Sequence, residues 1–164
     1  MKEFKTNIDG ADVNKDRKQH RELIEQVVRE LNIRYTDWNV MVESKPYKFK
    51  LYQARDGFNT TFYTRWKYDG AKLYLEGGFY RNDSGEQKCF IELYTVNKSE
   101  KINYALQDAA MVETLKRNGY NDISSQEGSP YFTKDLIISD YGKAGLIFTK
   151  ETDAMRPVVE QILK

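Results

Sequence analysis

Apolar and polar side chains alternate along most of the chain between Tyr47 and Val96. From Tyr47 to Tyr52, aromatic or apolar residues alternate with lysine, and a period of two is typical of a strand with one buried and one solvent-exposed face. The same period continues from Thr60 to Tyr68, from Lys72 to Tyr80 and from Lys88 to Tyr94. These four runs predict a four-stranded antiparallel meander.

The segments between the runs have the composition of turns. Asp56-Gly57 breaks the first run, and Asn82 to Gly85 has the residues of a turn. Asp69-Gly70 suits a two-residue type I′ hairpin, in which both central residues need positive φ. The pair Gly77-Gly78 inside the third run predicts either a bulge or a close approach of another backbone.

The alternation assigns each side chain to a face. The inner face receives Phe62, Trp66, Tyr68, Leu73, Leu75, Cys89, Ile91 and Leu93. The expected outer face carries Lys48, Lys50, Tyr52, Tyr63, Arg65, Lys67, Lys72, Tyr74, Lys88, Phe90 and Tyr94, with Glu76 and Glu92 as its carboxylates. Six cationic and two anionic side chains give this face a net charge of +4, although the whole chain carries only +1.

Helical periodicity flanks the meander. Apolar residues at helical spacing predict a first helix from Asp12, as its cap, to Asn32, a second from Asn97 to Asn118 and a last one around Met155 to Leu163. Residues 1–11 are expected to form an arm or a short edge strand, 33–42 a short strand or an irregular crossing, and 120–130 a loop. The runs 131–138 and 144–149 are expected to form a second hairpin. The sequence thus predicts one α+β domain over 1–164, with an antiparallel sheet of four to six strands and two or three helices on one face.

Composition narrows the functional class. A chain of 164 residues suits one domain, and a near-neutral charge implies no general affinity for polyanions or membranes. The single cysteine excludes an internal disulfide framework. The N-terminal residues have no apolar core of the signal-peptide kind, and no run is long enough for a membrane helix, so we expect a cytoplasmic protein without a membrane partner.

The outer face is the best candidate for a binding surface. Tyr52, Tyr63 and Tyr74 would supply aromatic contacts, and the cationic contacts would come from Lys48, Lys50, Arg65, Lys67 and Lys72. A protein partner is favoured, as for an inhibitor, an immunity protein or a self-associating subunit, because tyrosine and arginine serve as interface anchors. Single-stranded nucleic acid is the alternative, since tyrosines can stack bases while lysines contact phosphates.

A metal-dependent nuclease is a second alternative. Restriction-type nucleases hold Mg²⁺ with an acidic residue and the glutamate of a Glu-x-Lys triplet, whose lysine steadies the attacking water. Glu86-Gln87-Lys88 supplies such a triplet, and Asp69 or Asp83 could supply the other carboxylate. A second Glu-x-Lys triplet, Glu43-Ser44-Lys45, shows that this spacing arises easily by chance in a charge-rich chain.

Other constellations favour structural roles. Asp12 to Asp16 imitates the start of a calcium loop, but Arg17 and Leu23 stand where the turn glycine and the bidentate glutamate are needed. A nucleophilic pair of His20 and Cys89 would need a reactive thiol, whereas Cys89 is expected on the buried face. We find no cofactor or zinc motif and expect a binding protein without catalytic residues or a cofactor.

Overall fold

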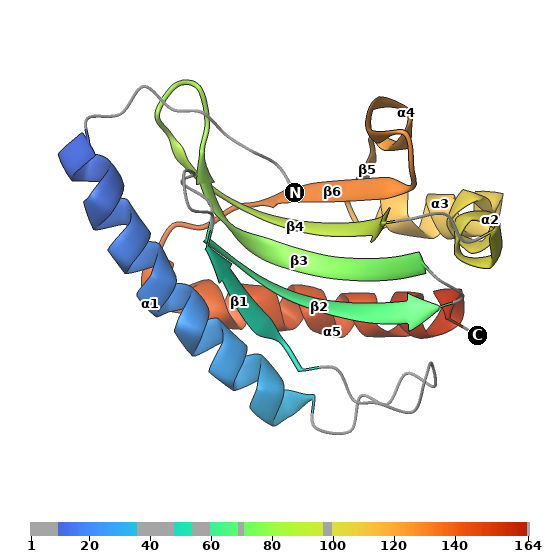
Figure 1. Ribbon diagram of the computed structural model, residues 1–164, viewed down its shortest axis with the longest axis horizontal. Coiled ribbons are helices and arrows are strands. Elements are labelled where there is room, and N and C mark those ends of the chain that lie inside the picture. Colours follow the sequence, from blue (N-terminus) through green and yellow to red (C-terminus); the bar gives the residue numbers. More distant parts are fainter. Residues whose placement is uncertain (1–9, 36–47, 54–59, 69–70, 97–99, 164) are drawn as a thin grey trace.

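The computed structural model describes residues 10–35, 48–53, 60–68, 71–96 and 100–163 (Figure 1). The strands in chain order are β1 (Lys50–Gln53), β2 (Thr60–Tyr68), β3 (Ala71–Arg81), β4 (Gln87–Val96), β5 (Asn121–Asp122) and β6 (Tyr131–Leu136). The helices are α1 (Gly10–Arg34), α2 (Glu100–Gln107), α3 (Ala109–Arg117), α4 (Ser124–Glu127) and α5 (Ala144–Ile162), with a 3-10 turn, η1 (Tyr141–Lys143), before α5.

The strands form one antiparallel sheet in the order β1-β2-β3-β4-β6-β5. The predicted meander is confirmed, because β1 to β4 pair in sequence along the sheet. β6 pairs with β4, and the two-residue β5 pairs with the other edge of β6. The fold is therefore α+β with an antiparallel sheet, as the alternation predicted.

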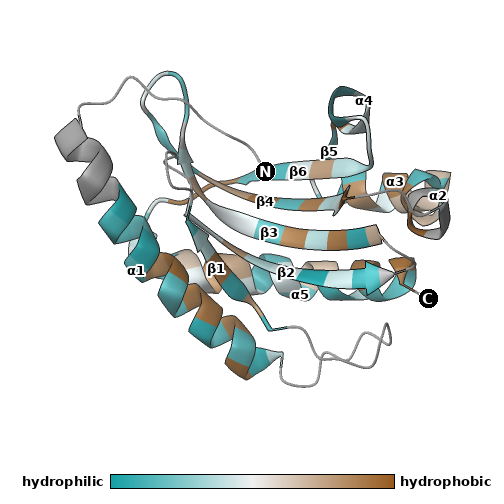
Figure 2. Ribbon diagram, viewed as in Figure 1, coloured by the Kyte–Doolittle hydropathy of each residue, from teal (hydrophilic) through white to brown (hydrophobic). Residues whose placement is uncertain are grey.

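Helices α1 and α5 cover the inner face of this sheet. Ile24, Val27 and Leu31 of α1 share one buried cluster with the inner-face residues Phe62 and Trp66. Phe148 of α5 meets the Phe62 ring edge-on at 4.8 Å between ring centres. Figure 1 shows α1 crossing the strands obliquely, with α5 beside it, and Figure 2 shows that hydrophobic positions alternate with hydrophilic ones in β3. Burial of this apolar surface is the main stabilising term of the fold.

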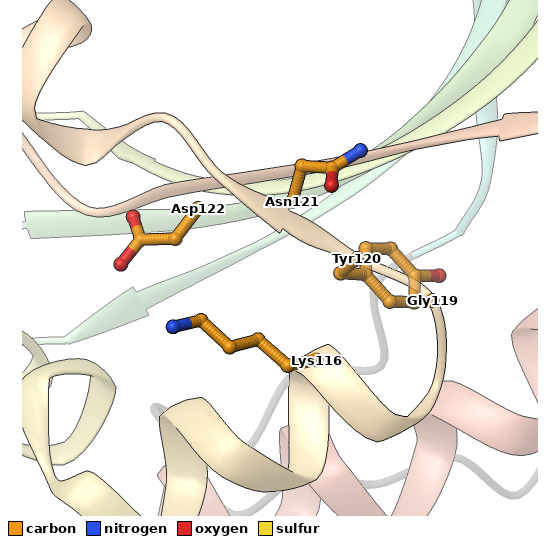
Figure 3. Close-up of a pocket in the computed structure, with 5 residues that line it drawn as sticks. All are labelled: Lys116, Gly119, Tyr120, Asn121 and Asp122. Carbon is orange, nitrogen blue, oxygen red and sulfur yellow. The ribbon is translucent and has the colours of Figure 1, made fainter.

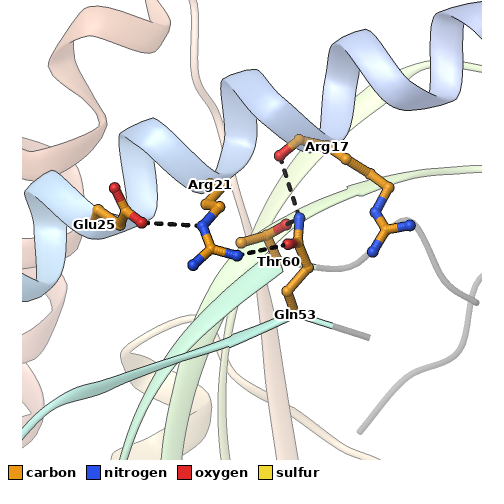
Figure 4. A network of polar contacts seen from close by, with 5 residues as sticks. All are labelled: Arg17, Arg21, Glu25, Gln53 and Thr60. Carbon is orange, nitrogen blue, oxygen red and sulfur yellow. Dashed lines mark hydrogen bonds and ion pairs between the residues drawn. The ribbon is translucent and has the colours of Figure 1, made fainter. Parts of the chain in front are cut away.

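Polar contacts complement this packing where α1 passes the end of β1 (Figure 4). The Gln53 amide donates to the Arg17 carbonyl and to the Thr60 hydroxyl, both at 3.3 Å. Arg21 donates to the Gln53 Oε1 at 3.2 Å and pairs with Glu25 one turn further along the helix. One glutamine therefore connects two strands to the helix.

The glycine pair in β3 allows a close approach and makes no bulge. The ladder with β2 continues through Thr61 opposite Gly78 and Phe62 opposite Gly77, and the ladder with β4 is also continuous. A Cβ on Gly77 would lie 2.6 Å from the Phe62 ring, and one on Gly78 would lie 2.9 Å from the Thr61 Cα. Glycine is required here by space.

The predicted second hairpin is wrong in its second half. Residues 144–149 form the start of α5, which runs on to Ile162 with Pro157 inside it. The local run Leu146 to Thr149 imitates a strand, but Ala144, Phe148, Thr152 and Met155 are all buried at helical spacing on one side. The helical conformation of residues 144–149 is favoured over a strand because these buried residues form one longer face that packs in the core against the sheet.

Other expected boundaries also shift. The predicted helix from Asn97 to Asn118 is divided into α2 and α3 at Asp108, whose carboxylate accepts a hydrogen bond from Met111 N at 3.1 Å and caps α3. The expected loop 120–130 contains β5 and α4. Helix α1 begins at Gly10, before the expected cap Asp12. Expectations for residues 1–9, 36–42, Asp56-Gly57 and Asp69-Gly70 lie outside the described residues.

Candidate functional site

The sheet register brings the predicted binding residues onto one outer face. Residues directly opposite each other in an antiparallel ladder point to the same side. The register places Lys50 opposite Tyr63, Arg65 opposite Tyr74, and Lys67 opposite Lys72. Tyr52 lies two residues beyond Lys50 on β1, and Lys48 lies exposed just before this strand. We call Lys48, Lys50, Tyr52, Tyr63, Arg65, Lys67, Lys72 and Tyr74 the tyrosine–lysine face.

Exposure varies within this face. The side chains of Lys48, Lys50 and Lys67 are exposed, and the other five residues are partly buried. None of the eight is fully buried, and helices α1 and α5 lie on the opposite side of the sheet. The tyrosine–lysine face therefore presents a mixed aromatic and cationic surface over β1 to β3.

A row of tyrosine rings crosses the outer face from β2 to β6. Tyr63 contacts Tyr74 at 6.1 Å between ring centres, tilted by 41°. Tyr74 stacks on Tyr94 at 5.1 Å and 3°, and Tyr94 stacks on Tyr131 at 4.8 Å and 11°. Neighbouring rings therefore lie on both sides of Tyr74, and its hydroxyl group accepts a hydrogen bond from Arg65 Nη1 at 3.5 Å.

Beside this row, two glutamates lie directly opposite each other. Glu76 on β3 and Glu92 on β4 form a ladder pair, so their Cβ atoms are about 5 Å apart. Their side chains are only 3 % and 0 % exposed. Hydroxyl groups donate to both carboxylates: Thr61 and Tyr94 to Glu76 at 3.1 and 3.3 Å, and Tyr131 and Thr133 to Glu92 at 2.5 and 3.3 Å. We call Glu76 and Glu92 the carboxylate pair.

The electrostatics of this pair follow from its burial. Desolvation, and then the like charge of Glu92, raise the pKa of Glu76 to about 7. Burial and the nearby carboxylates also raise the pKa of Tyr94 and of Tyr131 above the ordinary tyrosine value, so both phenols stay protonated and act as donors. The pair therefore carries less than two negative charges near neutral pH.

This burial corrects the sequence-based expectation for half of the face. Glu76, Glu92, Phe90 and Tyr94 lie on the predicted side of the sheet, but all four are buried where exposure was expected. One reason is packing from β6, which places Tyr131 and Thr133 against this half of the face. Alternation along one strand gives the direction of a side chain, whereas burial depends on neighbours distant in sequence.

Sequence reasoning missed the hydroxyl groups that complete the carboxylate pair. Thr61 lies on β2, and Tyr131 and Thr133 lie on β6. The available signal was the alternation of Tyr131 and Thr133 within a run already predicted to be a strand. The local pattern did not show that this run would pair with β4 and bring its hydroxyl groups to Glu92.

The proposed nuclease residues are only partly described. Glu86 and Lys88 form an ion pair with each other at 3.1 Å, with the Glu86 side chain 62 % exposed. Asp83 is exposed in the same turn, and Asp69 lies outside the described residues. Among the described residues, no three histidine, cysteine or acidic side chains cluster in a way that could hold a metal ion.

The two residues of the hypothetical nucleophilic pair are buried, as expected for Cys89. Cys89 is 0 % exposed, and burial raises the pKa of its thiol, which disfavours the reactive thiolate. His20 is 1 % exposed, stacks on Phe79 at 4.9 Å and hydrogen-bonds Gln87. His20 therefore belongs to the packing between α1 and the sheet.

A separate hollow of about 460 Å³ lies between α3 and β5. It is lined by Lys116, Gly119, Tyr120, Asn121 and Asp122. Figure 3 shows the Lys116 side chain extending below β5 toward Asp122, with the Asn121 side chain above the strand. Because Lys116 and Asp122 carry opposite charges, the lining of this hollow favours neither an anion nor a cation.

Within the described ranges, none of the helices has the length and apolar character needed to cross a bilayer. No protein-family model, no curated protein and no solved structure matches the chain.

Proposed function

We propose that this chain is a binding module that recognises a partner protein through the tyrosine–lysine face, without catalysis of its own. The observation that carries the proposal is the packing of Tyr74 between Tyr94, at 5.1 Å, and Tyr63, at 6.1 Å. A nucleic-acid platform needs accessible ring faces on which bases stack. Ring edges, hydroxyl groups and an arginine suit the polar and aromatic contacts of a protein interface.

Arg65 supports the same interpretation. Its guanidinium lies 3.5 Å from the Tyr74 hydroxyl and belongs to the residue directly opposite Tyr74 in the ladder. Tyrosine and arginine are enriched among the residues that contribute most to protein–protein affinity. Held on paired strands, they would lose less conformational freedom on binding than residues on a loop would.

Single-stranded nucleic acid remains the alternative because of the cations. Lys48, Lys50 and Lys67 are exposed, and none of the ion pairs among the described residues includes them. Such side chains can contact phosphates regardless of how the tyrosines stack. This alternative requires affinity that falls steeply with salt concentration.

An affinity-capture experiment tests the protein-binding proposal. Immobilised wild type is compared with Tyr52→Ala/Tyr63→Ala in an extract of the cells that produce it, and retained proteins are identified by mass spectrometry. The control is Tyr104→Ala, since Tyr104 is 69 % exposed on α2, away from the face. We expect a specific protein to be retained by wild type and control and lost from the double variant. Identical retention by all three would refute the proposal.

A parallel titration tests the alternatives. A labelled 20-nucleotide single strand is added at 50 and 200 mM NaCl, with and without Mg²⁺, and its anisotropy and length are measured. The proposal expects no binding at either salt concentration. Binding that weakens steeply with salt and depends on Tyr52 and Tyr63 would favour nucleic acid. Cleavage that requires Mg²⁺ and disappears in Glu86→Ala would favour the nuclease.

A further inference from the structure

Two lysines of the tyrosine–lysine face lie directly opposite each other. Lys67 on β2 and Lys72 on β3 form a ladder pair, and like charges in such positions destabilise a sheet. Neither is part of an ion pair among the described residues, and the same holds for Lys50. By contrast, Arg21, Arg34, Lys88, Lys134 and Arg156 each have a carboxylate partner within 3.1 Å.

Glu76 and Glu92, whose carboxylates lie on this side of β3 and β4, do not compensate these charges. Glu76 and Glu92 are buried, and their oxygens accept hydrogen bonds from threonine and tyrosine hydroxyl groups. Glu76 is also partly protonated near neutral pH, since burial raises its pKa to about 7. Among the described residues, the face therefore carries three lysines outside any ion pair, Lys50, Lys67 and Lys72, on three adjacent strands.

The strand geometry fixes the spacing of these cations. Arg65 and Lys67 are two residues apart on β2, which corresponds to about 7 Å along the strand. Lys50 on β1 lies opposite Tyr63, which is two residues before Arg65 and four before Lys67 on β2. The charges from Lys67 to Lys50 therefore extend over roughly 13 Å along the strands. Alternate side chains of an extended polypeptide repeat at this same interval of about 7 Å.

Resting on the proposed function, we infer that the partner docks an extended segment with acidic side chains at alternate positions, one of which lies between Lys67 and Lys72. A carboxylate there would relieve the repulsion within the lysine pair, while the next ones would reach Arg65 and Lys50. A second copy of this chain fits poorly, because a two-fold pairing of the same face would bring these cations together.

Model peptides test this inference without knowledge of the natural partner. Fluorescein-labelled (Glu-Thr)6 and (Gln-Thr)6 are titrated with wild type, with Lys67→Gln/Lys72→Gln and with Lys143→Gln/Lys150→Gln, by anisotropy at 50 mM NaCl. The last variant removes two exposed lysines at and near the start of α5 and matches the change in charge. We expect only (Glu-Thr)6 to bind, about fivefold more weakly to the Lys67/Lys72 variant and unchanged to the control.

Three binding results would overturn the acidic preference or the lysine contact. These are equal binding of the two peptides, equal weakening in both lysine variants, or tighter binding of a single-stranded DNA of the same charge that is lost in Lys67→Gln/Lys72→Gln. A concentration-dependent dimer that dissociates in Lys67→Gln/Lys72→Gln would replace the acidic segment by a second copy.

If the peptides do not bind but Tyr52→Ala/Tyr63→Ala still loses its captured protein, only the acidic preference fails. If the acidic peptide binds as expected but the tyrosine variant keeps its captured protein, the protein-binding proposal fails separately.

Discussion

The side-chain amide of Asn32 bonds both backbone groups of Phe49. Its Oδ1 accepts a hydrogen bond from Phe49 N at 2.8 Å, and its Nδ2 donates to the Phe49 carbonyl at 3.1 Å. The amide thus supplies, from helix α1, the two hydrogen bonds that a neighbouring strand would make. Phe49 precedes the edge strand β1, and open backbone groups at a sheet edge invite pairing with other chains.

Asn32→Ala is expected to destabilise the protein by about 2 kcal/mol, because two partly buried backbone groups of Phe49 lose these hydrogen bonds. Urea denaturation followed by circular dichroism measures the change. Asn121→Ala is the control, since Asn121 is exposed on β5. If both variants lose the same stability, the amide is not an effective substitute for a strand.

Much of the sheet could be predicted because its information is local. The alternating residues of β2 belong to one continuous run, and so do those of β3. Lys67 can therefore be assigned to the same face as Arg65 without any tertiary contact. The carboxylate pair could not be predicted in the same way. Glu92 is buried with Tyr131 and Thr133, which lie 39 and 41 residues further along the chain. Nothing in the alternation of β4 shows that these hydroxyl groups will be adjacent.

The C-terminal region shows how a local pattern can mislead. In a strand, residues 146 and 148 would point to the same face, whereas in a helix they point to nearly opposite sides. Leu146 is 70 % exposed, and Phe148 is fully buried against Phe62 and Phe79. Only the extended spacing from Ala144 to Ile162 distinguishes the helix from a strand.

The two side chains therefore give a matched pair of substitutions. Phe148→Ala is expected to cost about 3–5 kcal/mol, because it leaves a cavity between α5 and the sheet. Leu146→Ala should change the stability by no more than about 0.5 kcal/mol. Thermal and urea denaturation of both variants measure the difference. Similar losses for the two would indicate the strand arrangement and contradict helix α5.

Close backbone packing at the glycine pair gives a third prediction. A methyl group on Gly78 would lie against the Thr60 carbonyl and 2.9 Å from the Thr61 Cα, and neither backbone group can move without disturbing the β2–β3 ladder. Gly78→Ala is expected to destabilise the protein by about 3 kcal/mol. Gly142→Ala is the comparison, because its nearest contact is a side-chain oxygen of Asp140 at 3.2 Å. Equal stability of the two variants, measured by urea denaturation, would contradict the close approach.

The carboxylate pair makes the stability of the protein dependent on pH. Burial, and then the charge of Glu92, raise the pKa of Glu76 to about 7 from its ordinary value of 4.5. The native protein therefore binds this proton more tightly than the unfolded chain does. Its contribution is complete below about pH 4.5 and is lost as the pH rises through 7, so the free energy of unfolding should fall across this range.

Glu76→Gln removes the charge and leaves a side chain that can still accept the hydrogen bond from Thr61 or Tyr94. At pH 8.5 the variant should be more stable than wild type by on the order of 2 kcal/mol, and at pH 4.5 the difference should nearly vanish. Urea denaturation at the two pH values measures this, with Glu127→Gln on α4 as an exposed control. A gain that is the same at both pH values would mean that packing, and not the buried charge, separates the two proteins. A loss at pH 8.5 would mean that ionised Glu76 stabilises the sheet through its hydroxyl donors more than its burial destabilises it.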